Sequence, residues 1–122
     1  MANPNIVSVA NIEGKTEGKS LANSTETNLL TGASSVITKV NCVYVSNTDG
    51  TQAVNVTLSF TDTSASATYN LASTVSVPAD STLVVISKNE SIYLEETDVL
   101  KVTSGHASGK LDVVVSYEEI SE

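Results

Sequence analysis

Side chains able to do acid–base, nucleophilic or metal chemistry are few in this sequence of 122 residues, which has one histidine and one cysteine. His106 lies between Gly105 and Gly109 in a stretch typical of a turn. A catalytic triad or a zinc site needs further imidazole, thiolate or carboxylate groups at suitable spacing, which the sequence does not offer. We therefore expect His106 to be a solvated turn residue and predict no metal site.

Clustered acidic residues are the other candidates for chemistry. Glu95, Glu96 and Asp98 lie close together, but a glycosidase needs two carboxylates facing each other across a sugar. Such enzymes usually also offer aromatic platforms, and the sequence contains no tryptophan. We expect these acidic residues to lie in solvated turns.

The segment Asn47-Thr48-Asp49-Gly50 is similar to part of a calcium loop. It lacks the further carboxylates and the distal bidentate glutamate of such a loop, so we interpret it as a hairpin turn. The sequence also contains no phosphate-binding glycine loop and no nucleophile elbow. It therefore predicts a protein that is not an enzyme, with no catalytic residue and no cofactor.

Cys42 is the lone cysteine, so no internal disulfide can form. It lies in the apolar run from Val40 to Val45, where we expect a buried and unreactive thiol. The first residues lack a basic region followed by an apolar stretch, so we predict no signal peptide and synthesis in a cytoplasm. No apolar run approaches the length of a bilayer span, and we expect no membrane association.

Composition favours β-structure and excludes one class of partner. Valine, serine and threonine are abundant, and β-branched residues suit a pleated sheet better than a helix. Six lysines oppose 14 acidic residues, which gives a net charge of −8 without any arginine. Because an acidic surface repels phosphate and arginine is the preferred reader of bases, we predict no nucleic-acid binding.

Alternating apolar and polar residues predict the strands. The clearest strand is 54–60, where apolar residues alternate with polar ones, and 111–117 has the same pattern. Further strands are expected near 36–45, 68–77, 92–94 and 99–102, with 83–86 as a short strand buried on both sides. Val36, Val40, Cys42 and Tyr44 are expected on one face, with a bulge near Val43.

These strands and their short polar connections predict an all-β protein, a single antiparallel β-sandwich of about eight strands. The pattern does not distinguish jelly-roll from Ig-like topology. We divide the one domain into residues 1–35, an N-terminal arm with edge strands, and residues 36–122, the sandwich core. Within the arm, Ile6, Val7 and Val9 predict a short strand, 14–20 is polar and punctuated by glycine, and a weak strand is expected within 20–30.

Five stretches resemble small structural proteins encoded by tailed phages, in particular marine phages that infect cyanobacteria. They are MANPNIV (1–7), VYVSNTDGT (43–51), ASTVSVPADSTLVVI (72–86), IYLEE (92–96) and SYEEI (116–120). The resemblance covers most of the chain and implies a structural role in the virion, with no catalytic residue transferred. The expected function is therefore that of a capsid decoration protein bound to the major capsid protein. A neck, tail or baseplate protein and a carbohydrate-binding module for host attachment are the alternatives.

A homo-oligomer is also expected, with a trimer as the form suggested by analogy with other β-sandwich decoration proteins. The arm and the loop tips such as 61–66 are the expected contact regions. The individual residues predicted to contact a partner are Asn5, Ile6, Val7, Val9 and Tyr69. Tyr69 is included because it stands beside the polar loop and apart from the apolar pattern.

Overall fold

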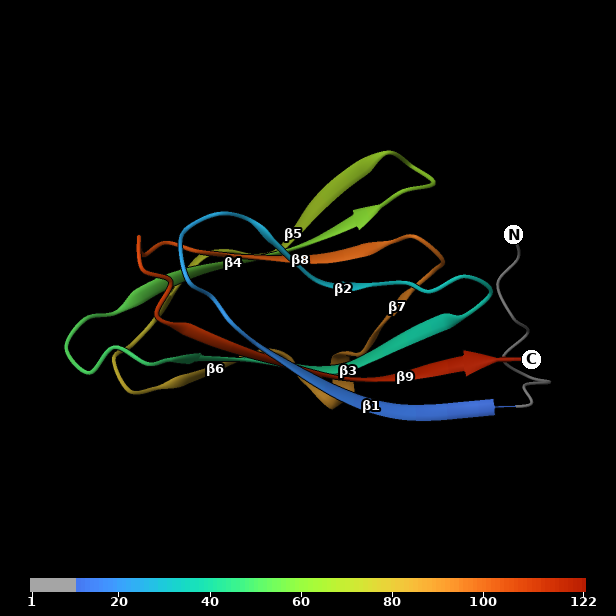
Figure 1. Ribbon diagram of the computed structural model, residues 1–122, viewed down its shortest axis with the longest axis horizontal. Coiled ribbons are helices and arrows are strands. Elements are labelled where there is room, and N and C mark those ends of the chain that lie inside the picture. The colour runs from blue at the N-terminus through green and yellow to red at the C-terminus, as the bar shows by residue number, and fades with distance from the viewer. Residues whose placement is uncertain (1–10) are drawn as a thin grey trace.

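Two antiparallel sheets face each other in the computed structural model, which describes residues 11–122 (Figure 1). The first, sheet A, has the order β1 (Asn11–Ser20), β9 (Leu111–Ser121), β3 (Ile37–Asn47) and β6 (Thr82–Ile86), and β7 (Ile92–Leu94) also pairs with β3. The second, sheet B, has the order β2 (Thr27–Thr31), β8 (Val99–Ser104), β4 (Val54–Asp62) and β5 (Ala67–Val77). A 3-10 turn, η1 (Lys88–Glu90), separates β6 from β7. The prediction of an all-β antiparallel sandwich is confirmed.

The strand pairing is nested. β1 pairs with β9, β2 with β8, β3 with β6 and β7, and β4 with β5, so that only β4–β5 joins strands consecutive in the described chain. This arrangement, an antiparallel ribbon folded over into two sheets, is jelly-roll topology. Of the two topologies left open by the sequence, the strand order is that of the jelly roll.

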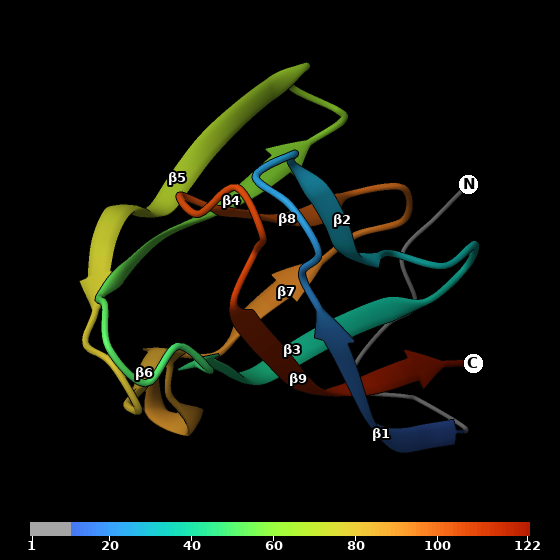
Figure 2. The same ribbon diagram turned by 60° about the vertical axis from the view of Figure 1, so that its left-hand side comes forward.

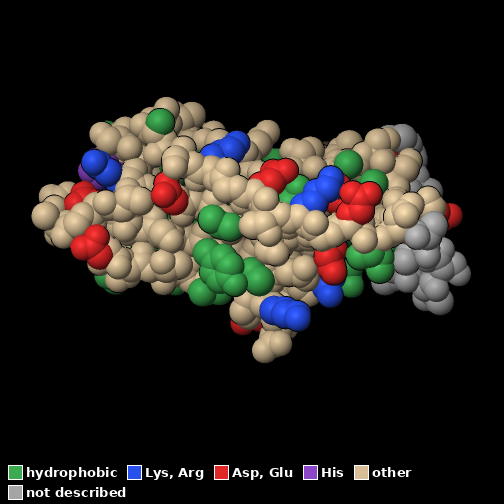
Figure 3. Space-filling model, turned by 60° about the horizontal axis from the view of Figure 1, so that its bottom comes forward, with side chains coloured by type: hydrophobic (Ala, Val, Ile, Leu, Met, Phe, Trp, Pro, Cys, Tyr) green, Lys and Arg blue, Asp and Glu red, His purple; other side chains and the backbone are tan. Residues whose placement is uncertain are grey.

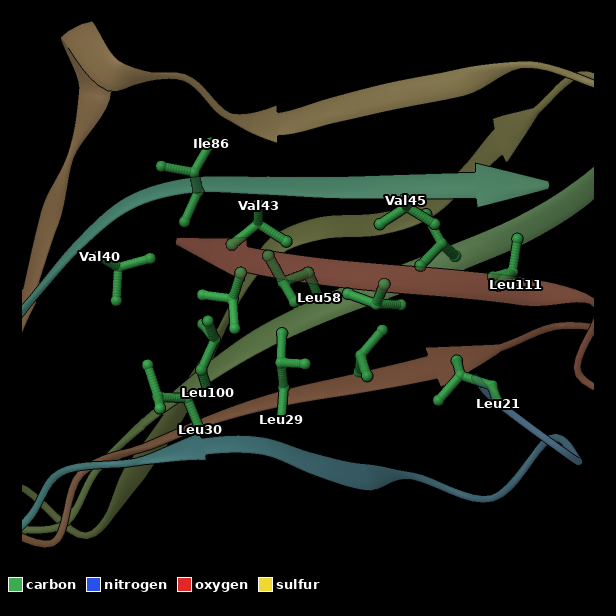
Figure 4. Close-up of a cluster of buried hydrophobic side chains, with 14 of the residues drawn as sticks. Leu21, Leu29, Leu30, Val40, Val43, Val45, Leu58, Ile86, Leu100 and Leu111 are labelled. Carbon is green, nitrogen blue, oxygen red and sulfur yellow. The ribbon is translucent and has the colours of Figure 1, made fainter. Parts of the chain in front are cut away.

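The core lies between the sheets and is built mainly from valine and leucine, with Ile86 and Tyr117 (Figure 4). Leu58 of β4, Leu100 of β8 and Val43 of β3 are fully buried there. Each such side chain stabilises the fold by roughly 1.5–3 kcal/mol relative to an exposed one. The alternation predicted for 111–117 is confirmed, since Leu111, Val113, Val115 and Tyr117 are buried. In β4 it holds from Val54 to Leu58 and then breaks, because the polar Ser59 is buried as well.

A bulge in β3 changes the predicted faces of that strand. The register against β9 shifts between Val40 and Cys42, so Val40, Val43 and Val45 are buried. Tyr44 is exposed and Cys42 is half-buried. The expectation that Val40, Cys42 and Tyr44 share a face is therefore wrong, and so is the expectation of a buried thiol. The bulge predicted near Val43 is confirmed, since the register of β3 against β6 shifts between Val43 and Tyr44, in addition to the shift against β9.

The predicted hairpin at Asp49-Gly50 is also wrong. β3 belongs to sheet A and β4 to sheet B, so residues 48–53 cross between the sheets instead of joining two paired strands. Asp49 Oδ1 accepts hydrogen bonds from the backbone N–H groups of Thr51 (2.9 Å) and Gln52 (3.2 Å). This side-chain turn needs no left-handed residue pair, unlike the two-residue hairpin.

The run 83–86 forms an edge strand, not the strand buried on both sides that its continuous apolar sequence predicts. Among residues 11–122, β6 pairs only with β3, and Val84 is 48% exposed. Pro78 ends β5 as expected, and the turn to β6 contains Asp80 in a left-handed conformation (φ 55°).

The polar segment 14–20 lies within a ten-residue strand, β1, that pairs along its whole length with β9. The weaker strand expected within 20–30 is found as β2, at the edge of sheet B. Residues 1–10, which include Asn5, Ile6, Val7 and Val9, lie outside the described residues. Within residues 11–122, no helix has the length and apolar character needed to cross a bilayer.

Candidate functional site: the uncharged side of the sandwich

The acidic cluster at 95–98 is a structural anchor. Asp98 is 3% exposed, and its carboxylate accepts hydrogen bonds from the backbone N–H of Glu95 (3.0 Å) and of Thr63 (3.1 Å). Its backbone carbonyl accepts a further bond from Gly32 N–H at 2.8 Å. Asp98 thus joins the β2–β3, β4–β5 and β7–β8 connections at one end of the sandwich. The expectation of a solvated Asp98 is wrong, while Glu95 is exposed as predicted.

Gly32 is required at this anchor by its surroundings. A Cβ atom built on it would lie 2.1 Å from the backbone oxygen of Glu95, which is far inside van der Waals contact. Neither Thr63 nor Gly32 can be connected with Asp98 from the sequence, because both partners are distant along the chain. The only local signal is the position of Asp98 directly before the alternating strand 99–102.

His106 lies in the β8–β9 turn, as expected, and is half-buried rather than fully solvated. Its Nδ1 accepts a hydrogen bond from the backbone N–H of Ser108 at 2.9 Å. This bond stabilises the turn. Among the described residues, no hydrogen bond joins the His106 imidazole to a hydroxyl or thiol side chain. No group of three or more His, Cys, Asp or Glu side chains within 11–122 is arranged to hold a metal ion.

The edge strand of sheet A on one side, β1, is heavily charged. Every second residue from 13 to 19 is charged: Glu13, Lys15, Glu17 and Lys19. These residues stand opposite β9 residues, several of which face the core. Lys15 forms an ion pair with Glu119, and the hydrogen bond between them raises the pKa of Lys15. These charges point inward from an edge, a known device against edge-to-edge association.

Two further bonds connect β1 with the rest of the sandwich. Glu17 accepts a hydrogen bond from the buried Tyr117 hydroxyl at 2.7 Å. Lys19 Nζ donates to the backbone oxygen of Asn28 in β2 at 2.9 Å and so bridges the two sheets. Burial, together with the bond to Glu17, raises the pKa of Tyr117 well above its usual value.

The strands at the opposite side of the sandwich differ from β1 in carrying no charge. β5 is the edge of sheet B, while β6 and β7 lie in line along the edge of sheet A, and we call these three strands the β5–β7 side. Figure 2 shows β5 and β6 toward one margin of the molecule, with β1 and β2 toward the other. None of the three strands contains a charged residue.

Most of the exposed large apolar residues belong to these three strands. Of the seven large hydrophobic residues exposed within 11–122, five belong to β5, β6 and β7. These five are Tyr69 (56% exposed), Leu71 (42%), Val75 (37%), Val84 (48%) and Tyr93 (47%). Edge strands without charge and with exposed apolar side chains are templates for association unless a partner covers them.

The apolar surface continues from β6 onto the outer face of sheet A. Val84 stands opposite Tyr44 of β3, which in turn stands opposite Val114 of β9. A group of hydrophobic side chains is visible among mostly polar atoms in Figure 3, which turns the sheet A side toward the viewer. Tyr44 thus places an aromatic ring next to Val84 of β6.

Tyr69 is the one predicted contact residue that the structure describes. It stands opposite Phe60 of β4, close to the β4–β5 turn that Thr63 connects to Asp98. The sequence analysis does not predict the other exposed apolar residues Leu71, Val75 and Val84 as contacts, although residues 81–87 and all of β5 lack charge. No protein-family model matches the chain, and no curated protein matches it.

Proposed function

We propose that this chain is a non-catalytic structural protein of a virion, a decoration protein that binds the assembled capsid shell. The observation that carries the assembly role is the β5–β7 side, where exposed apolar side chains stand on edge strands without a single charge. Exposed apolar side chains on uncharged edge strands are typical of an interaction surface. The sequence resemblance to tailed-phage structural proteins supports placing this partner in a virion.

The jelly roll supports the same proposal without requiring it. Jelly rolls occur in viral capsid proteins and in lectins, and a fold alone does not define a function. Decoration would stabilise the shell by mass action, since a ligand that binds only the assembled state shifts the equilibrium toward it. The major capsid protein is the proposed partner.

Quantitative mass spectrometry of purified particles tests this function. The chain should be present in a number comparable to that of the major capsid protein. Far fewer copies would contradict decoration and favour the neck, tail or baseplate. Absence from particles would overturn the virion role, and a glycan-array screen would then test the carbohydrate-binding alternative.

A further inference from the structure

We infer that the β5–β7 side is covered by a second copy of this chain, packed through β5. This inference deepens the proposed function and rests on it, because it names the molecule that covers the same surface. Three properties of β5 and β6 carry it: their charge, the symmetry of their apolar residues, and the irregular backbone of β5.

Charge favours a copy of the chain over a partner of opposite charge. The chain has a net charge of −8, so two copies repel each other over most of their surfaces. β5 and β6 offer a stretch where they can meet without bringing carboxylates together, since the one charge between these strands is Asp80 in the connecting turn. A basic partner would instead be selected by acidic side chains, which these strands lack.

Two of the exposed apolar residues of β5 are placed symmetrically in sequence. Leu71 and Val75 lie two residues before and two residues after Ser73, which is also exposed. If two β5 strands run antiparallel about a twofold axis near Ser73, Leu71 of each copy lies opposite Val75 of the other. A twofold interface requires this kind of self-complementary pattern.

The irregular backbone of β5 favours contacts through side chains over continuous β-sheet hydrogen bonding between copies. Its register against β4 shifts twice, between Val56 and Leu58 and between Leu58 and Ser59. Thr74 has a φ of 46°, and its N–H donates to Thr57 Oγ1 at 3.0 Å. Bulges of this kind interrupt strand addition, so the edge supports a closed pair of molecules instead of an open fibre.

Sedimentation velocity of the full-length protein over a concentration series tests the inference. The wild type should have twice the chain mass of 12.7 kDa. Leu71→Glu places a carboxylate at the contact in both copies and should raise the dissociation constant on the order of 100-fold. The matched control is Ile12→Glu, which replaces an exposed apolar residue on the charged edge strand β1 and should leave the mass unchanged.

A second variant keeps the test valid if Leu71→Glu does not fold. Ser73→Cys in a Cys42→Ser background should form a covalent dimer under mild oxidation, since residue 73 lies near the proposed axis. A larger oligomer that Leu71→Glu dissociates would still place a copy on this surface. A wild type that is monomeric, or an oligomer that Leu71→Glu leaves intact, overturns the inference.

The two proposals fail separately. A monomeric wild type that is abundant in particles and loses particle binding through Leu71→Glu would assign the surface to a shell protein, and only the second copy would be refuted. A dimer that is absent from particles would refute the virion role alone.

Discussion

β1 and β5 are both long edge strands, one closing sheet A on one side and the other closing sheet B on the opposite side. β1 carries two glutamates and two lysines, whereas β5 carries no charge and exposes Tyr69, Leu71 and Val75. One sandwich thus contains an edge protected against association and an edge that is not. This contrast supports the proposal that the apolar edge is a contact surface, since the same chain shows how an edge can be protected by charge.

The largest expected effect comes from removing the Asp98 carboxylate, which holds the β4–β5 and β7–β8 connections together. Asp98→Ala removes the acceptor for the backbone N–H groups of Thr63 and Glu95 and should lower the free energy of unfolding by about 3 kcal/mol. Urea denaturation measures the loss. Glu90→Ala, at an exposed carboxylate with one hydrogen bond from Ser87, should change stability by less than about 0.5 kcal/mol. Equal losses in the two variants would show that Asp98 is not an anchor.

Removing the charges from β1 should make the two edges alike. Replacing Glu13, Lys15, Glu17 and Lys19 by threonine removes the inward charges and should produce species larger than those of the wild type, as measured by light scattering. The control exchanges the signs at the same four positions, which keeps a charged edge and should prevent the additional association. If the uncharged variant associates no more than the wild type, the charges do not protect β1.

A smaller effect is expected where β1 meets the core. Tyr117→Phe removes the hydroxyl that bonds to Glu17 and should lower the free energy of unfolding by about 1 kcal/mol. Tyr93→Phe, at an exposed tyrosine, is the control and should change stability little. Thermal unfolding followed by circular dichroism compares the two, and a silent Tyr117→Phe would remove this bond from the description of the β1 edge.

The smallest expected effect is a pH dependence confined to the turns beside β4. Hydrogen bonds from Thr51 lower the pKa of Asp49, and hydrogen bonding from the Ser64 side chain lowers that of Asp62. A carboxyl group whose pKa is lower in the folded state than in the unfolded state stabilises the fold at pH values above the ordinary aspartate pKa of about 4. This contribution is lost as the pH falls through the folded pKa. The urea midpoint should therefore fall less on acidification in the Asp49→Asn/Asp62→Asn variant than in the wild type, and equal slopes would contradict this assignment.

Sequence patterns predicted the strands whose apolar residues alternate, such as β4 and β9, because one face of each packs on the core. The full extent of β1 was not predicted, because the residues that alternate along it are charged and not apolar. Its period of two is formed by Glu13, Lys15, Glu17 and Lys19. Asp49-Gly50 signals a change of direction but not the sheet that the next strand joins. The burial of β6 likewise depends on its place at an edge, which its own five residues do not specify.

The candidate site was predictable only in part. The position of Tyr69 beside a polar loop predicts an exposed residue, and Tyr69 is exposed. Leu71, Val75 and Val84 read as ordinary core residues until the topology places β5 and β6 at edges. The anchor at Asp98 depends on Thr63, which is 35 residues away and has no local signature.

Hydrogen–deuterium exchange of the wild type at low and at high protein concentration tests the contrast between the two edges most directly. If β5 is the contact surface, amide protection should rise with concentration in residues 67–86, while exchange in β1 residues 11–20 stays constant. Protection that appears in residues 11–20, or in neither segment, would contradict the assignment of the uncharged side as the surface of association.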